Sequence, residues 1–127
     1  KDAFLMRINT TSKNISVKEA YHYGQVSGEF IVHDCATSVE TGKIFLIGST
    51  TSDLYGQTLN GPIGAAILCL DSDGSNNWAR ILSQTNIQAM GNSIAIENGK
   101  IVITGDAKTV SGSPPNDFLS DNIIGGK

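Results

Sequence analysis

The chain carries the same pattern of residues twice. Residues 42–48 read Gly-Lys-Ile-Phe-Leu-Ile-Gly, and residues 99–105, which begin 57 positions later, read Gly-Lys-Ile-Val-Ile-Thr-Gly. Residues 2–9 and residues 64–71, which begin 62 positions apart, share an apolar strand pattern that ends in Asn or Asp. Repeats of this length are typical of architectures in which one unit buries its apolar face only against neighbouring units. The sequence therefore constrains the architecture of the protein more strongly than its chemistry.

Each repeat consists of short strands joined by tight turns. Apolar and polar residues alternate over four segments of each repeat, and no segment of ten or more residues keeps a helical period. Asp71-Ser72-Asp73-Gly74 and Glu97-Asn98-Gly99 place Asp, Asn and Gly where hairpin turns need positive φ angles. The predicted strands are residues 2–9, 15–23, 35–40 and 43–50 in the first repeat, and 64–71, 77–84, 92–97 and 100–108 in the second.

Four antiparallel strands per repeat are what one blade of a β-propeller requires. We therefore predict an all-β fold with β-propeller-type blades, built from two four-stranded antiparallel sheets. Residues 1–58 form the first predicted blade and residues 59–112 the second, and residues 113–127 form a connector and lead-in to a following repeat or a neighbouring subunit. Because propellers have about four to eight blades, two blades make an incomplete ring as a single chain.

The second repeat also resembles a known family of repeats. Residues 65–78 run from an apolar strand through an Asp-x-x-Gly turn to Trp78, and residues 91–105 run from Gly91-Asn92 to a strand that closes at Gly105. This arrangement resembles the bacterial SBBP β-propeller repeat. The first repeat matches that family at residues 2–4, 34–36 and 42–48, but Asn9-Thr10-Thr11-Ser12 replaces the turn and no Trp follows. The resemblance implies propeller blades and no particular chemistry, because such repeats occur in large surface proteins that share no activity.

The two ends of the chain read as complementary parts of one repeat. Residues 123–127 look like the lead-in to a strand such as the one that residues 2–5 begin, and Pro114 and Pro115 favour an extended connector before them. The sequence leaves three explanations open. The chain is a piece of a longer repetitive protein, a protomer of a ring closed by heterologous contacts, or a protomer of a filament whose neighbours are joined by strand addition.

Two glycosylation sequons are the candidate modification sites. They are Asn9-Thr10-Thr11 and Asn14-Ile15-Ser16. Asn9 aligns with Asp71 in the predicted turn between the first two strands, where a bulky glycan would be exposed. A plain Asn turn explains the same residue, so both interpretations stay open.

The remaining polar residues favour structural roles. Residues 71–77 resemble a calcium loop, but Asn76 and Leu82 occupy the positions that require Gly and Glu. His22 and the pair His33-Asp34 have no nucleophile or second acid near them in the sequence. We therefore predict no catalytic, cofactor-binding or metal-binding residues and no enzymatic activity. Cys69 fits a small buried residue of an apolar strand, and the redox state of Cys35 and Cys69 stays open.

Composition excludes two classes of partner. The net charge is −3 and no cluster of Lys and Arg occurs, which argues against a nucleic-acid partner. No apolar run reaches the roughly 18 residues that a membrane-spanning helix needs. Four aromatic residues are candidates for stacking on sugar rings, although blade packing uses aromatic side chains in the same way; they are Tyr21, Tyr23, Tyr55 and Trp78.

The sequence predicts a structural or interaction module of an extracellular or cell-surface repeat protein. In this interpretation the chain is a repeating unit of a larger chain or of a self-assembling fibre, with Asn9 and Asn14 as glycosylation sites. Its predicted partners are copies of itself, adjacent repeats of a longer chain, and glycans. The alternative function is that of a carbohydrate-binding propeller, a lectin or an adhesin.

Overall fold

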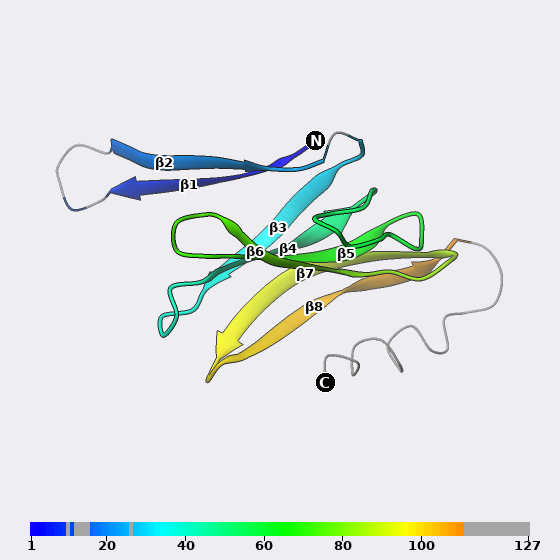
Figure 1. The fold of residues 1–127 in the computed structure, drawn as a ribbon. Helices are drawn as coiled ribbons and strands as arrows, with labels where there is room; N and C mark the ends of the chain where they lie inside the picture. Colours follow the sequence, from blue (N-terminus) through cyan, green and yellow to red (C-terminus); the bar gives the residue numbers. More distant parts are fainter. Residues whose placement is uncertain (10, 12–15, 26, 111–127) are drawn as a thin grey trace.

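The residues that the structure describes form eight β-strands, which lie in three layers (Figure 1). The computed structural model describes residues 1–9, 11, 16–25 and 27–110, and no helix occurs within these ranges. Every pair of neighbouring strands is antiparallel, which confirms the predicted all-β, antiparallel fold class. The strands are β1 (Ala3–Asn9), β2 (Ser16–Tyr23), β3 (Phe30–Thr37), β4 (Ile44–Thr50), β5 (Gly64–Leu70), β6 (Asn76–Leu82), β7 (Ile87–Glu97) and β8 (Lys100–Thr109).

The strands group into sheets differently from the predicted pair of four-stranded sheets. β3, β4, β5 and β6 form one four-stranded sheet, called the central sheet below, whereas β1–β2 and β7–β8 are two-stranded hairpins. Seven residue pairs join β4 to β5, from Ile44 opposite Leu70 to Thr50 opposite Gly64. The boundary predicted between residues 58 and 59 therefore lies in the connection between two strands of one sheet. A repeat fixes the order of its strands but leaves open the strand at which each sheet begins. The predicted connector, residues 113–127, lies outside the described residues.

Each face of the central sheet is covered by one of the two hairpins (Figure 1). β1–β2 packs on the face that carries Leu46 and Leu68, and contributes Tyr23 to that core. β7–β8 packs on the opposite face, which carries Ile47, and contributes Ile94. All residues of β4 and β5 are buried, because both of their faces are covered. This explains why residues 44–47 of β4 and residues 65–70 of β5 are continuous apolar runs rather than alternating sequences.

The four hairpins are of two kinds, which alternate along the chain: β1–β2 and β5–β6 share one pattern of strand register, and β3–β4 and β7–β8 share another. In both β3–β4 and β7–β8 the pairing shifts by one residue beside a glycine of the second strand, Gly48 in the first hairpin and Gly105 in the second. In both β1–β2 and β5–β6 the pairing shifts near the end of the first strand, after Arg7 and after Cys69. A β-bulge bends its strand and increases the local twist, so equivalent hairpins carry this bend at the same position.

The contacts between layers recur in the same way. The backbone N–H of Phe30, at the start of β3, donates a hydrogen bond of 2.9 Å to the carbonyl oxygen of Lys1. The N–H of Ala89, in β7, donates a corresponding bond of 3.0 Å to the carbonyl oxygen of Ile63. Each bond joins the strand that begins a new sheet to the residues before β1 or β5. The packing of one layer on the next therefore repeats along the chain.

The predicted turn chemistry is confirmed at two hairpins. Asn98 and Gly99, between β7 and β8, have φ angles of 49° and 72°. Two successive positive φ angles are typical of the two-residue turns that match strand twist. Gly74, in the turn between β5 and β6, has a φ of 85°, a conformation that L side chains rarely adopt.

Candidate assembly surfaces on the outer hairpins

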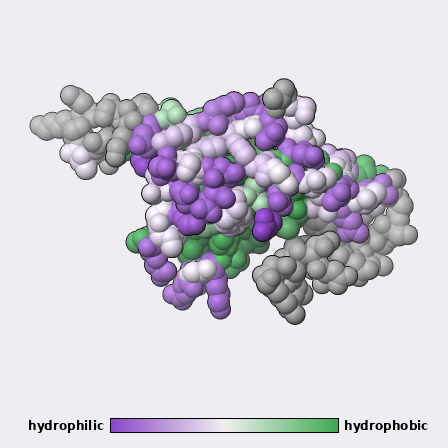
Figure 2. Space-filling view, viewed as in Figure 1, coloured by the Kyte–Doolittle hydropathy of each residue, from purple (hydrophilic) through white to green (hydrophobic). Residues whose placement is uncertain are grey.

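Large apolar side chains are exposed on the two outer hairpins. On β1, Phe4 is 72% exposed, and Met6 and Ile8 are each 45% exposed; these alternate residues share one face of the strand. On β8, Val102 is 58% exposed and Ile101 is 36% exposed. Figure 2 shows apolar surface gathered on the side of the molecule where β7 and β8 lie. Contiguous exposed apolar side chains of this kind mark interaction surfaces.

The residues at the corresponding positions of the central sheet are buried. The two repeat offsets, 62 and 57 residues, match Phe4 with Ala66, Met6 with Leu68, Ile8 with Leu70, Ile101 with Ile44, and Val102 with Phe45. All five central-sheet residues are at most 8% exposed. The side chains exposed on β1 and β8 therefore occupy positions that are buried in the central sheet, where the equivalent hairpins are paired into four strands.

Sequence reasoning did not identify these surfaces, although a signal was present. Residues 3–6 are apolar at every position, as are residues 101–103, and a strand that is apolar on both faces needs cover on both faces. In the described part of the chain, β1 and β8 have only one hydrogen-bonded neighbour each and one covered face.

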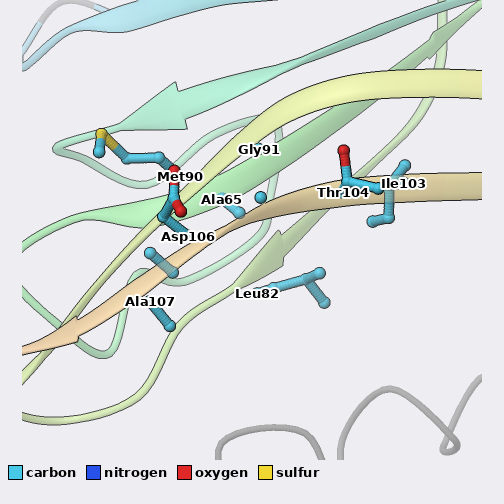
Figure 3. A pocket seen from close by; sticks show the side chains of 10 residues that line it. Ala65, Leu82, Met90, Gly91, Ile103, Thr104, Asp106 and Ala107 are labelled. Atoms are coloured by element: carbon cyan, nitrogen blue, oxygen red, sulfur yellow. The ribbon is translucent and has the colours of Figure 1, made fainter.

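A cavity of about 270 Å³ lies between β8 and the edge of the central sheet (Figure 3). Most of its wall is apolar, with Leu82 at the end of β6 facing the cavity together with Ile103 and Ala107 of β8. The two strands of the β7–β8 hairpin are too few to cover β6 as well as β4 and β5. The lining residues are Ala65, Leu82, Ala89, Met90, Gly91, Ile103, Thr104, Gly105, Asp106 and Ala107.

One of the two predicted glycosylation sites, Asn9, lies at the end of the β1–β2 hairpin where β1 stops. Asn9 is the last residue of β1 and pairs with Ser16 at the start of β2. Asn14 and Ile15 of the second sequon lie outside the described residues, and its third residue, Ser16, begins β2. The structure therefore places Asn9 at the end of its strand, next to the connection to β2, where the alignment with Asp71 predicts it.

Asp34 joins β3 to the bulge of β7. One of its carboxylate oxygens, Oδ2, accepts hydrogen bonds from Ser93 Oγ (2.7 Å) and from the backbone N–H of Ile94 (2.9 Å). The other, Oδ1, accepts a bond from the N–H of Cys35. These hydrogen bonds, chiefly that from Ile94, lower the pKa of Asp34. Next to it, His33 Nδ1 lies 2.8 Å from the carbonyl oxygen of Gly91. The pair His33-Asp34 thus links β3 of the central sheet to β7 of the neighbouring layer.

The carboxylates of the segment that resembles a calcium loop accept hydrogen bonds from other residues of the same segment. Asp73 Oδ1 accepts hydrogen bonds from the N–H and the hydroxyl of Ser75, and these bonds lower the pKa of Asp73. The carboxylate of Asp71 accepts bonds from the side-chain amide of Asn77. Within the described ranges, no group of three or more His, Cys, Asp or Glu residues is arranged to hold a metal ion.

All four predicted aromatic residues contact a core: Tyr23 belongs to one cluster, Tyr21 and Tyr55 pack against it, and Trp78 packs against the other. Tyr23 is buried and donates a hydrogen bond of 2.7 Å to the carbonyl oxygen of Gly74. The ring of Trp78 meets that of Phe45 edge to face, with centroids 6.0 Å apart, and the guanidinium of Arg80 lies 5.8 Å from the centroid of Trp78. These contacts give both rings structural roles in packing.

Cys35 and Cys69 are not joined by a disulfide bond. Cys35 is exposed on β3, whereas Cys69 is fully buried in β5, as predicted for a small residue of an apolar strand. Burial also raises the pKa of the Cys69 thiol. The two cysteines therefore differ strongly in access to reagents.

Comparison with protein-family models, curated proteins and solved structures finds no match to this chain. Among the residues that the structure describes, no helix has the length and apolar character needed to cross a bilayer.

Proposed function

We propose that this chain is a structural and interaction module of an extracellular or cell-surface repeat protein, and that it works by joining copies of itself or like repeats into a larger assembly. The observation that carries the proposal is the exposure of Phe4, Met6 and Ile8 at positions whose counterparts in the central sheet are buried. Burial of apolar surface contributes about 25 cal/mol per Å², so covering this row favours association.

Under this proposal the layers are propeller-type blades of the SBBP kind. The central sheet, residues 30–82, is one whole blade, in place of the blades predicted at residues 1–58 and 59–112. β1–β2 is the second half of the preceding blade, and β7–β8 is the first half of the following blade. The shared register of equivalent hairpins and the face-to-face layers support this assignment. One chain then holds part of a ring or part of a filament.

Glycosylation of Asn9 and Asn14 belongs to the same proposal, because a sugar-decorated turn fits an extracellular module. The position of Asn9 at the end of β1 supports it. Sugar binding has less support, since Tyr23 is buried and Trp78 packs against Phe45.

Light scattering of the purified chain, measured across a wide concentration range, tests the proposal. We expect the mean mass to exceed the 13.4 kDa of the chain and to rise with concentration or to reach a fixed multiple. A mass of one chain at every concentration would contradict self-assembly.

A further inference from the structure

We propose that β1 of a second copy of this chain pairs with the outer edge of β8, so that β7, β8 and the second copy's β1 and β2 form one four-stranded antiparallel sheet. This inference rests on the proposed function of assembly and specifies the joint through which assembly occurs. In the described part of the chain, β8 pairs only with β7 and β1 pairs only with β2. An edge strand with unpaired N–H and C=O groups is a template for pairing with another chain.

The central sheet supplies the template for this joint. Its β3–β4 hairpin has the register of β7–β8, and its β5–β6 hairpin has the register of β1–β2, including the position of each register shift. In the central sheet these two kinds of hairpin are joined through β4 and β5. The other hairpin of each kind, β1–β2 at one end of the described residues and β7–β8 at the other, is not paired with a hairpin of the opposite kind. A second copy therefore brings together the two halves that one copy holds apart.

The β4–β5 pairing predicts the register of the joint. Ile44 lies opposite Leu70, Leu46 opposite Leu68, and Gly48 opposite Ala66. Adding 57 to the residue numbers of β4 gives the equivalent residues of β8, and subtracting 62 from those of β5 gives the equivalent residues of β1. The equivalent pairs are Ile101 opposite the second copy's Ile8, Ile103 opposite its Met6, and Gly105 opposite its Phe4.

This register buries the exposed apolar row of β1. Directly opposite residues of an antiparallel pair lie on the same face, so Met6 of the second copy shares the face of Ile103. Ile103 packs toward the central sheet, against the core that contains Ile47 and Ile67. The second copy's Phe4, Met6 and Ile8 therefore turn toward the central sheet as well.

The cavity lies where those side chains would go. Its wall combines Leu82 and Ala65 of the central sheet with Ile103 and Gly105 of β8, and most of it is apolar (Figure 3). The backbone of Met90 occupies the space directly over Gly105, so the ring of the second copy's Phe4, placed opposite Gly105, extends beside it into the cavity, toward Leu82. The added hairpin then covers the part of β6 that β7–β8 leaves open.

The joint can connect more than two copies. It uses β1 of one copy and β8 of the next, so the contact is heterologous, and a copy whose β1 is paired still has an unpaired β8 edge that can bind a further copy. Repetition of one heterologous contact produces a closed ring or an open filament, depending on the rotation between copies.

Cross-linking between two variants that each carry one introduced cysteine tests the joint. Both variants carry Cys35→Ser, which removes the exposed thiol, and keep the buried Cys69. One carries Ile8→Cys and the other Ile101→Cys, and the two are mixed and mildly oxidised after circular dichroism shows that each keeps the wild-type strand content. We expect a covalent heterodimer, because directly opposite residues lie about 4.5–5.5 Å apart.

A matched control shifts the register by two residues. Ile103→Cys replaces Ile101→Cys in the mixture with Ile8→Cys, which places the thiols on a diagonal at about 7–8 Å, beyond the usual reach of a disulfide. We expect roughly tenfold less heterodimer from this pair. Equal or greater yield would overturn the proposed register.

The outcomes separate the joint from the assembly. Oligomers of the wild-type chain without the 8–101 cross-link would overturn the joint and leave self-assembly standing. A chain that stays monomeric and forms no cross-link would overturn both.

Hydrogen exchange on the wild-type chain provides a second test that needs no substitution. We expect the amide groups of β1 and β8 to become protected as concentration rises, with β4 and β5 unchanged. Protection of the β8 edge that is independent of concentration would overturn the proposal, since a segment of the same chain would then occupy that edge.

Discussion

Tyr23 of β2 donates a buried hydrogen bond of 2.7 Å from its hydroxyl group to the carbonyl oxygen of Gly74, in the turn between β5 and β6. The bond joins the outer β1–β2 hairpin to the central sheet across 51 positions of the chain. Burial, with a smaller contribution from Tyr21 and Tyr55, raises the pKa of Tyr23 to about 12. Attachment of the hairpin therefore depends on a polar contact as well as on apolar packing.

Removal of this hydroxyl should destabilise the protein modestly. Tyr23→Phe leaves the ring in place but leaves the Gly74 carbonyl without this buried donor, at an expected loss of about 1–2 kcal/mol of unfolding free energy. Urea denaturation measures the change. Tyr23→Ala, which also removes the ring, should cost about 3–5 kcal/mol. Equal stability of Tyr23→Phe and wild type would show that the hydrogen bond contributes nothing.

The same residue predicts a loss of stability at alkaline pH. The folded-state pKa is raised from 10.0 to about 12, so the contribution of Tyr23 is complete below pH 10 and is lost as pH rises toward 12. The loss amounts to at most about 2–3 kcal/mol. Tyr23→Phe cannot lose this contribution, so the difference between its stability and that of wild type should shrink over this range. A difference that stays constant would contradict the raised pKa.

Asp34 should govern part of the stability at acid pH. Its pKa is lowered by hydrogen bonds from Ile94, Ser93 and Cys35, so its contribution is present above its ordinary value of 3.8 and is lost as pH falls through its lower folded-state pKa. We expect Asp34→Asn to lower the thermal midpoint at pH 7 and to approach wild type below pH 4. Glu40→Gln, in an exposed turn, is the control. A pH-independent difference between Asp34→Asn and wild type would disprove the interpretation.

Two glycine substitutions separate backbone strain from crowding. Gly74 and Gly99 have similar φ angles of 85° and 72°, but a Cβ at Gly74 would approach the Tyr21 ring at 2.5 Å, whereas one at Gly99 would meet nothing within 4 Å. Gly99→Ala should therefore cost about 1 kcal/mol from strain alone. Gly74→Ala should cost a further 1–3 kcal/mol or so from overpacking. Similar losses in urea denaturation would show that the β1–β2 hairpin does not press on this turn.

Most strands could be predicted from the sequence, but their grouping could not. Periodicity identified β4, β5 and β8 closely, since their apolar residues stand between clear turn residues. The strands β3 and β7 begin at Phe30 and Ile87, about five residues before their predicted starts, because bulges near His33 and Asn92 interrupt the alternation. The sheet boundaries were misplaced because a period does not specify its own starting point. Contacts between layers, such as Asp34 with Ile94, depend on folding and leave no local signal.

The central claim is that the exposed apolar row of β1 drives assembly of this chain. Native mass spectrometry of the wild type and of Phe4→Lys tests it most directly, because Phe4 is 72% exposed and its replacement leaves the described core intact. We predict masses at multiples of 13.4 kDa for the wild type, and for Phe4→Lys a loss of assembly affinity of roughly tenfold or more. A wild-type spectrum that shows only the single chain, or a Phe4→Lys variant that assembles like the wild type, would contradict the account.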